Sequence, residues 1–101
     1  MQQFRTYQLA LELYQDVELC LKAGTIKGAK RDQLDRAALS ISLNLIEGDS
    51  RPTQKERKRF FFIALGSLRE TQLLLKLCKC KELEGKADKL GAHLYKLCRA
   101  L

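Results

Sequence analysis

Residues 83–101 read LEGKADKLGAHLYKLCRAL, and the apolar positions in this stretch decide the fold class. These positions alternate spacings of four and three residues: Leu83, Ala87, Leu90, Leu94, Leu97 and Leu101. Residues with this spacing lie on one face of an α-helix and form a seam that packs against other helices. The stretch therefore predicts an amphipathic helix that belongs to a helical assembly.

Two helices are predicted in the first half of the chain, over residues 4–23 and 30–47. In both segments apolar side chains recur at spacings of three and four, which is the helical period. Gly24 follows the first segment and Gly48 follows the second, and glycine is the residue most common just after a helix end.

A further helix is predicted to begin at Thr53, which forms a capping box with Glu56 three residues later. This helix extends toward Cys80, and a break is expected within residues 81–85. Short connections between four helices predict an all-α fold, an antiparallel up-down-up-down four-helix bundle. A chain of 101 residues fits a single domain over residues 1–101.

The charge balance of the chain is basic. Lys and Arg total 19 against 12 Asp and Glu, a formal net charge of +7. Such an excess suits an anionic partner such as RNA or DNA, and a solvated basic surface is the alternative. The N-terminus lacks the pattern of a signal peptide and no apolar run is long enough to span a membrane, so a cytoplasmic protein is expected.

The candidate nucleic-acid-binding residues fall into two basic groups. The first comprises Arg51, Lys55, Arg57, Lys58 and Arg59, and the second comprises Lys27, Lys30 and Arg31. A helix N-terminus favours anions, so phosphate is expected near Thr53. The two groups flank successive connections of the bundle and should form separate patches. The chain has no aromatic and glycine-rich recognition motif, so little sequence preference is expected.

Three consecutive phenylalanines predict self-association. Successive helix positions are about 100° apart, so three adjacent rings cannot share one core face, and an exposed ring forgoes burial. A neighbouring subunit would cover it; coverage by the N-terminal arm or a loop is the alternative. The candidate interface residues are Phe60, Phe61, Phe62 and Leu65.

Polar residues at helical spacing predict a hydrogen-bonded network between two helices. Its candidate members are Arg36, Ser40, Asn44 and Glu47, with Ser67 and Glu70 as partners. Buried polar groups need such partners. An active site is the other interpretation, but no nucleophile–base pair accompanies these residues, and no enzymatic activity is predicted.

The four cysteines are expected to be free thiols that pack as small hydrophobic groups. Cys78 and Cys80 are two positions apart and would point away from each other on a helix, and His93 is the only histidine. No metal and no cofactor are therefore predicted.

Two segments resemble motifs of the bacterial four-helix-bundle family of the 23S rRNA intervening-sequence protein. They are RAALSISLNLIEG at residues 36–48 and KERKRFFFIALGSL at residues 55–68. The resemblance covers a little under half of the chain. Ser42 departs from the pattern, because many relatives have proline there.

The resemblance implies a bundle that commonly assembles as a ring-shaped homopentamer without known enzymatic activity. A related branch comprises the Avd accessory proteins of diversity-generating retroelements, which bind nucleic acid and partner a reverse transcriptase. The expected function is therefore a non-catalytic, oligomeric, nucleic-acid-associated adaptor. The alternatives are an accessory subunit that binds a reverse transcriptase and a purely structural oligomer.

Overall fold

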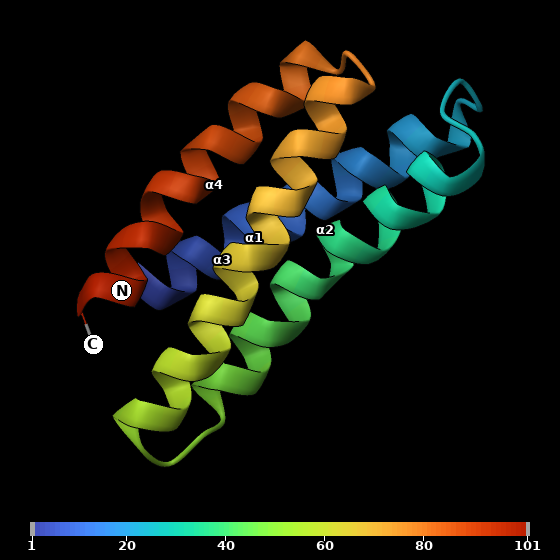
Figure 1. Ribbon diagram of the computed structural model, residues 1–101. Coiled ribbons are helices and arrows are strands. Elements are labelled where there is room, and N and C mark those ends of the chain that lie inside the picture. Colours follow the sequence, from blue (N-terminus) through green and yellow to red (C-terminus); the bar gives the residue numbers. More distant parts are fainter. Residues whose placement is uncertain (1, 101) are drawn as a thin grey trace.

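The computed structural model describes residues 2–100, and these residues form four α-helices with no strand among them. The helices are α1 (Gln2–Lys22), α2 (Gly28–Asp49), α3 (Gln54–Leu77) and α4 (Lys81–Ala100). Consecutive helices run in opposite directions (Figure 1). Each helix packs against two others, because α1 contacts α2 and α4, and α3 contacts the same two. The predicted all-α four-helix bundle is confirmed.

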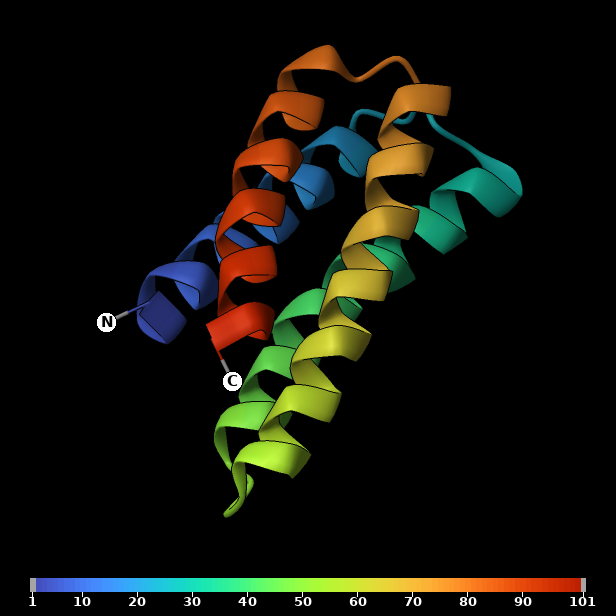
Figure 2. The same ribbon diagram turned by 60° about the vertical axis from the view of Figure 1, so that its left-hand side comes forward.

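The bundle is asymmetric along its length. The α2–α3 hairpin extends past the ends of α1 and α4, so its turn projects beyond both chain termini (Figures 1 and 2). The longest dimension of the molecule is 42 Å against 21 and 18 Å across. Only two helices are therefore present at this end to cover each other's side chains.

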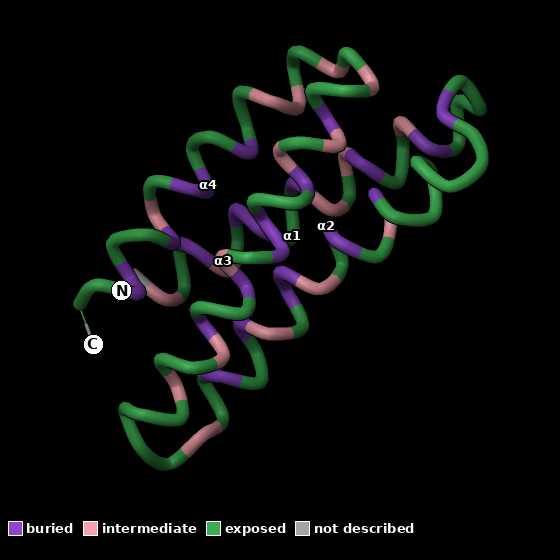
Figure 3. The backbone as a smooth tube through the Cα atoms, viewed as in Figure 1, coloured by how far each residue is buried: buried purple, intermediate pink, exposed green. Residues whose placement is uncertain are grey.

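The core contains the apolar seams that the periodicity predicts. In α4, Ala87, Leu90, Leu94 and Leu97 are buried, whereas Leu101 lies outside the described residues. The largest fully buried side chains of the other helices are Leu13, Val17, Leu34, Ile41, Phe61, Leu68 and Leu75. Burial of each such side chain contributes about 1.5–3 kcal/mol. Buried positions follow the inward faces of the helices, and the projecting turn is exposed (Figure 3).

The start of α3 is fixed by its predicted capping box. Thr53 has extended backbone geometry, and its Oγ1 accepts a hydrogen bond of 3.2 Å from the backbone nitrogen of Glu56. The same hydroxyl donates to the Glu56 carboxylate at 3.1 Å. At the end of α1, Gly24 has φ +79°, a conformation that glycine adopts without strain. Both sequence signals thus mark real helix boundaries.

Gly48 does not end α2, which continues to Asp49. A Cβ at Gly48 would lie 2.6 Å from Cε1 of the Phe61 ring, closer than two carbons approach. The glycine is therefore needed for the close approach of α3, because only hydrogen fits between the two helices there.

The expected break within residues 81–85 is wrong in position. The chain leaves α3 after Leu77 and enters α4 at Lys81, so Gly85 lies inside α4. The turn is made by Lys79, which has φ +60°. This left-handed conformation is uncommon for a residue other than glycine, which is why the sequence pattern did not predict it.

None of the helices in the described part of the chain has a segment apolar and long enough to cross a lipid bilayer.

Candidate nucleic-acid interface

The first basic group lies on the projecting end of the α2–α3 hairpin, which we call the tip. Its members come from the turn and the first two turns of α3: Arg51, Lys55, Arg57, Lys58 and Arg59. Lys55, Lys58 and Arg59 are exposed, and the other two are half-buried. The five cations therefore differ in their surroundings and in their access to solvent.

Arg51 and Arg57 hold the turn together. Arg57 Nε donates a 2.8 Å hydrogen bond to the carbonyl oxygen of Arg51, and Arg51 Nη2 donates to Glu47 Oε2 at 2.6 Å. The guanidinium of Arg51 also lies 4.7 Å from the centroid of the Phe60 ring. Because a carboxylate already compensates Arg51, its charge contributes less to an external anion site.

Lys55, Lys58 and Arg59 form a different set, at positions i, i+3 and i+4 on one exposed face of α3. Within residues 2–100, none of the three forms an ion pair with a carboxylate. Lys58 Nζ lies 5.9 Å from the Phe62 ring centroid, and Arg59 Cζ lies the same distance from that of Phe60. These three positive charges face solvent without an ion-pair partner among the described residues.

The three phenylalanines point in different directions. Phe61 is 1% exposed and fills the core of the bundle against Gly48. Phe60 is half-buried and Phe62 is 48% exposed. Leu65 is half-buried and packs against the core. Phe61, which the sequence grouped with the interface residues, therefore cannot contact another subunit, because the α2–α3 packing already encloses its ring.

Three of the six polar residues singled out from the sequence meet between α2 and α3. The hydroxyls of Ser40 and Ser67 are 2.9 Å apart, and Asn44 Nδ2 donates to Ser40 Oγ at 3.0 Å. Thr71, which the sequence pattern did not reveal, extends this group by donating to the Ser67 carbonyl at 2.8 Å.

The other three polar residues lie elsewhere. Glu47 pairs with Arg51 at the tip. Arg36 and Glu70 are exposed and join neither the Ser40–Ser67 group nor, within residues 2–100, any ion pair. The polar residues that meet thus connect two helices through neutral hydrogen bonds only.

The second basic group lies at the other end of α2. Lys27, Lys30 and Arg31 are exposed around the α1–α2 connection, and Arg31 Nη1 is 3.8 Å from Asp32 Oδ1. A helix of 22 residues is about 33 Å long. The two basic groups are therefore separate patches on the bundle, as their positions in the sequence predict.

A tyrosine–carboxylate contact that the sequence did not predict joins α1 to α2 near this second group. The Tyr14 hydroxyl donates a 2.8 Å hydrogen bond to Asp35 Oδ1. Burial, together with this bond and the nearby carboxylate charge, raises the pKa of Tyr14 to about 12. In the described residues, no group of three or more His, Cys, Asp and Glu side chains is placed to hold a metal ion.

The fold and this surface define a small helical bundle with a projecting basic hairpin. The chain belongs to the family described as 23S rRNA-intervening sequence protein, whose family model matches residues 2–101. The family membership that the two motifs indicated is thereby confirmed, and the match extends over nearly the whole chain. No curated protein matches the chain, and no solved structure does.

Proposed function

We propose that this protein is a non-catalytic, oligomeric adaptor that binds RNA or DNA through the tip with little sequence preference. The observation that carries the proposal is the exposed face of Lys55, Lys58 and Arg59 on the projecting hairpin, where none of the three forms an ion pair within residues 2–100. Phosphate contacts of this kind supply affinity without reading bases.

The location of the tip supports contact with a large anion. The hairpin projects past α1 and α4 (Figure 2), so a nucleic-acid backbone reaches it without meeting the rest of the bundle. The three cations also follow the N-terminus of α3, where the helix dipole adds partial positive charge. The family description, which refers to an intervening sequence of 23S rRNA, is in keeping with a nucleic-acid setting.

Assembly would strengthen this surface. Phe62 is 48% exposed and Ile63 is 42% exposed on α3, and Leu43 and Ile46 are more than half exposed on α2. Another subunit that covered such side chains would gain about 25 cal/mol for each Å² of apolar area buried. Phe62 lies one turn after Lys58, so an interface there would bring the basic faces of neighbouring subunits close together. A ring of five subunits, each with a charge of +7, would carry about +35.

A matched pair of triple variants tests the proposal. Lys55→Gln/Lys58→Gln/Arg59→Gln removes three charges from the tip, and Lys27→Gln/Lys30→Gln/Arg31→Gln removes three from the opposite end. Filter-binding titrations with a short RNA at two salt concentrations should show at least a ~10-fold loss of affinity for the tip variant. Its salt dependence should also fall, by about 0.7–0.9 in log–log slope for each phosphate that the variant no longer neutralises. The opposite-end variant should bind nearly as the unmodified protein does.

Equal losses of affinity in both variants would assign binding to net charge and contradict a site at the tip. Binding that is insensitive to salt, or absent at low salt, would remove the nucleic-acid role. If the protein binds no RNA or DNA but co-purifies with a reverse transcriptase, the accessory-subunit alternative would be favoured.

A further inference from the structure

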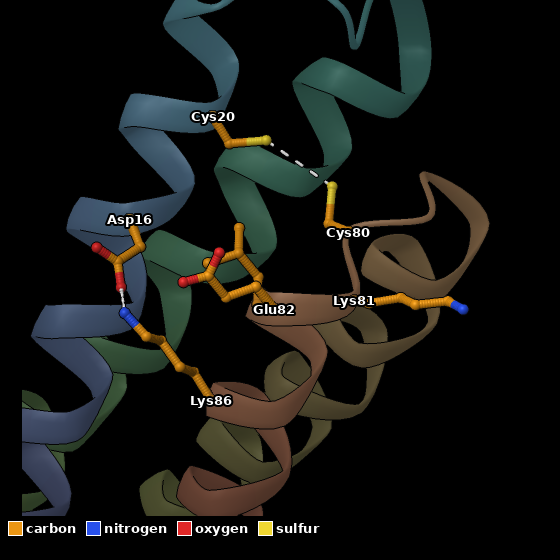
Figure 4. Close-up of a pocket in the computed structure, with 7 residues that line it drawn as sticks. Asp16, Cys20, Cys80, Lys81, Glu82 and Lys86 are labelled. Carbon is orange, nitrogen blue, oxygen red and sulfur yellow. Dashed lines mark hydrogen bonds and ion pairs between the residues drawn. The ribbon is translucent and has the colours of Figure 1, made fainter.

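Two cysteines that are 60 residues apart in the sequence meet at the end of the bundle opposite the tip. Cys20 lies near the end of α1, and Cys80 lies in the connection between α3 and α4. Their Sγ atoms are 3.8 Å apart and face each other (Figure 4). Both residues are half-buried, so the pair is accessible to small molecules.

The two thiols line a cavity of about 370 Å³. Lys81, Lys86, Asp16 and Glu82 also line it, so its charges balance. Lys86 pairs with Asp16 beside the cysteines, and Lys81 points away from them (Figure 4). The cavity thus gives a small reagent access to the sulfur atoms without selecting strongly for charge.

The surroundings of Cys80 permit the two sulfurs to come closer. A disulfide requires about 2.05 Å between sulfurs, so the pair must approach by a little under 2 Å. Cys80 lies outside the helices, directly after Lys79 with its φ of +60°. The backbone of Cys80 is itself hydrogen-bonded to Leu75 and Glu84, so the approach of the two sulfurs falls mainly to rotation of the two side chains.

We propose that Cys20 and Cys80 form a dithiol modification site, which small-molecule disulfides such as oxidised glutathione close reversibly into an intramolecular disulfide.

The reaction is two successive thiol–disulfide exchanges. One protein thiolate attacks a sulfur of the reagent and forms a protein–glutathione mixed disulfide. The reagent's S–S bond breaks, and the other glutathione departs as a thiolate. The second protein thiolate attacks the protein sulfur of that mixed disulfide, forms the Cys20–Cys80 bond and expels the second glutathione thiolate. The two protons of the protein thiols pass through solvent to the two glutathione molecules. The protein loses two electrons and the reagent gains them.

The protonation of Cys80 sets the conditions for closure. Burial, together with its contact to Cys20, raises the pKa of the Cys80 thiol to about 11. Because the thiolate is the nucleophile, closure should be slow near neutral pH and faster as the pH rises.

The other two cysteines are less suited to this exchange. Cys98 is fully buried in the core. Cys78 contacts the Cys80 sulfur through its backbone carbonyl oxygen, at 3.7 Å, whereas Cys20 contacts it through its own sulfur. Cys78→Ser therefore serves as the control.

Oxidation of the reduced full-length protein tests the proposal. The protein is incubated with oxidised glutathione at about pH 8.5, where more thiolate forms, then alkylated and analysed by mass spectrometry. The unmodified protein and Cys78→Ser should lose two hydrogens and yield a peptide pair linked through Cys20 and Cys80. Cys20→Ser and Cys80→Ser should stop at the glutathione adduct. The closed form should melt about 10 °C higher than the reduced form, and dithiothreitol should reverse this.

A glutathione adduct that persists on the unmodified protein, or a disulfide through Cys78 or between subunits, would overturn the proposal. Phenylarsine oxide, whose arsenic requires two neighbouring thiols, gives a test that needs no variant. It should protect Cys20 and Cys80, but not Cys78, from alkylation. Unprotected alkylation of Cys20 and Cys80 would overturn the proposal even if the serine variants failed to fold.

Discussion

The two ends of the bundle differ in the helices that form them and in how far they project from the rest of the molecule. At the tip only α2 and α3 are present, and Lys55, Lys58 and Arg59 face solvent without carboxylate partners among residues 2–100. At the opposite end α1 meets the α3–α4 connection, and Lys86 pairs with Asp16. Arg31 likewise lies within 3.8 Å of a carboxylate, whereas Lys27 and Lys30 form no ion pair within residues 2–100. A net charge of +7 is thus a property of the whole chain, whereas a surface for anions also depends on where unpaired cations project into solvent.

The largest loss of stability at the tip is expected when the buried ring of Phe61 is removed. Phe61→Ala should lower the free energy of unfolding by about 3–5 kcal/mol, because Phe61 is 1% exposed and its loss leaves a cavity. At protein concentrations too low for assembly, Phe62→Ala, one residue away and 48% exposed, should change it by less than about 0.5 kcal/mol. Urea unfolding compares the two, and sedimentation of Phe62→Ala should show fewer subunits per particle. Similar stabilities for both variants would contradict the assignment of inner and outer rings.

The next largest effect is expected where α2 and α3 approach most closely. Gly48→Ala should destabilise the protein by about 1–3 kcal/mol, because the added Cβ would lie 2.6 Å from the Phe61 ring. Gly85→Ala is the matched control, since a Cβ there meets open space in α4 and should stabilise by about 0.5–1 kcal/mol. Thermal melts of the pair check both signs. A stabilising Gly48→Ala would show that the helices separate easily at the tip.

The polar contact in the middle of the bundle should have a smaller effect. Ser67→Ala removes the 2.9 Å contact with Ser40 and should cost about 1 kcal/mol, measured by urea unfolding. Glu70→Ala, three residues further along α3 and exposed, should change stability by less than about 0.5 kcal/mol. A larger cost at Glu70 would mean that an ionic network outweighs the hydroxyl pair.

The last expected effect is a pH dependence far from the tip. The folded-state pKa of Tyr14 is raised from 10.0 to about 12, so the folded protein holds the phenolic proton more tightly than the unfolded chain does. The resulting stabilisation is complete below about pH 10 and is lost as the pH rises toward 12. Tyr14→Phe should therefore lose less stability than the unmodified protein over this interval in alkaline melts. Identical pH profiles would show that the Asp35 contact does not hold in solution.

The helices, the capping box at Thr53 and the buried seam of α4 could be predicted from the sequence because each depends on local spacing. The contact between Gly48 and Phe61 could not, because glycine after an apolar helix reads equally well as a stop signal. The turn at Lys79 has no residue signature, since lysine rarely takes positive φ. The Tyr14–Asp35 and Cys20–Cys80 contacts join distant segments, and only the packed bundle brings them together.

Cross-linking of a bound nucleic acid tests the central claim most directly. A photoreactive RNA is bound at low salt and irradiated, and the modified peptides are identified by mass spectrometry. If the tip is the binding surface, the cross-links should concentrate between Arg51 and Phe62 and disappear at high salt. Cross-links concentrated around Lys27, Lys30 and Arg31, or none at low salt, would contradict it.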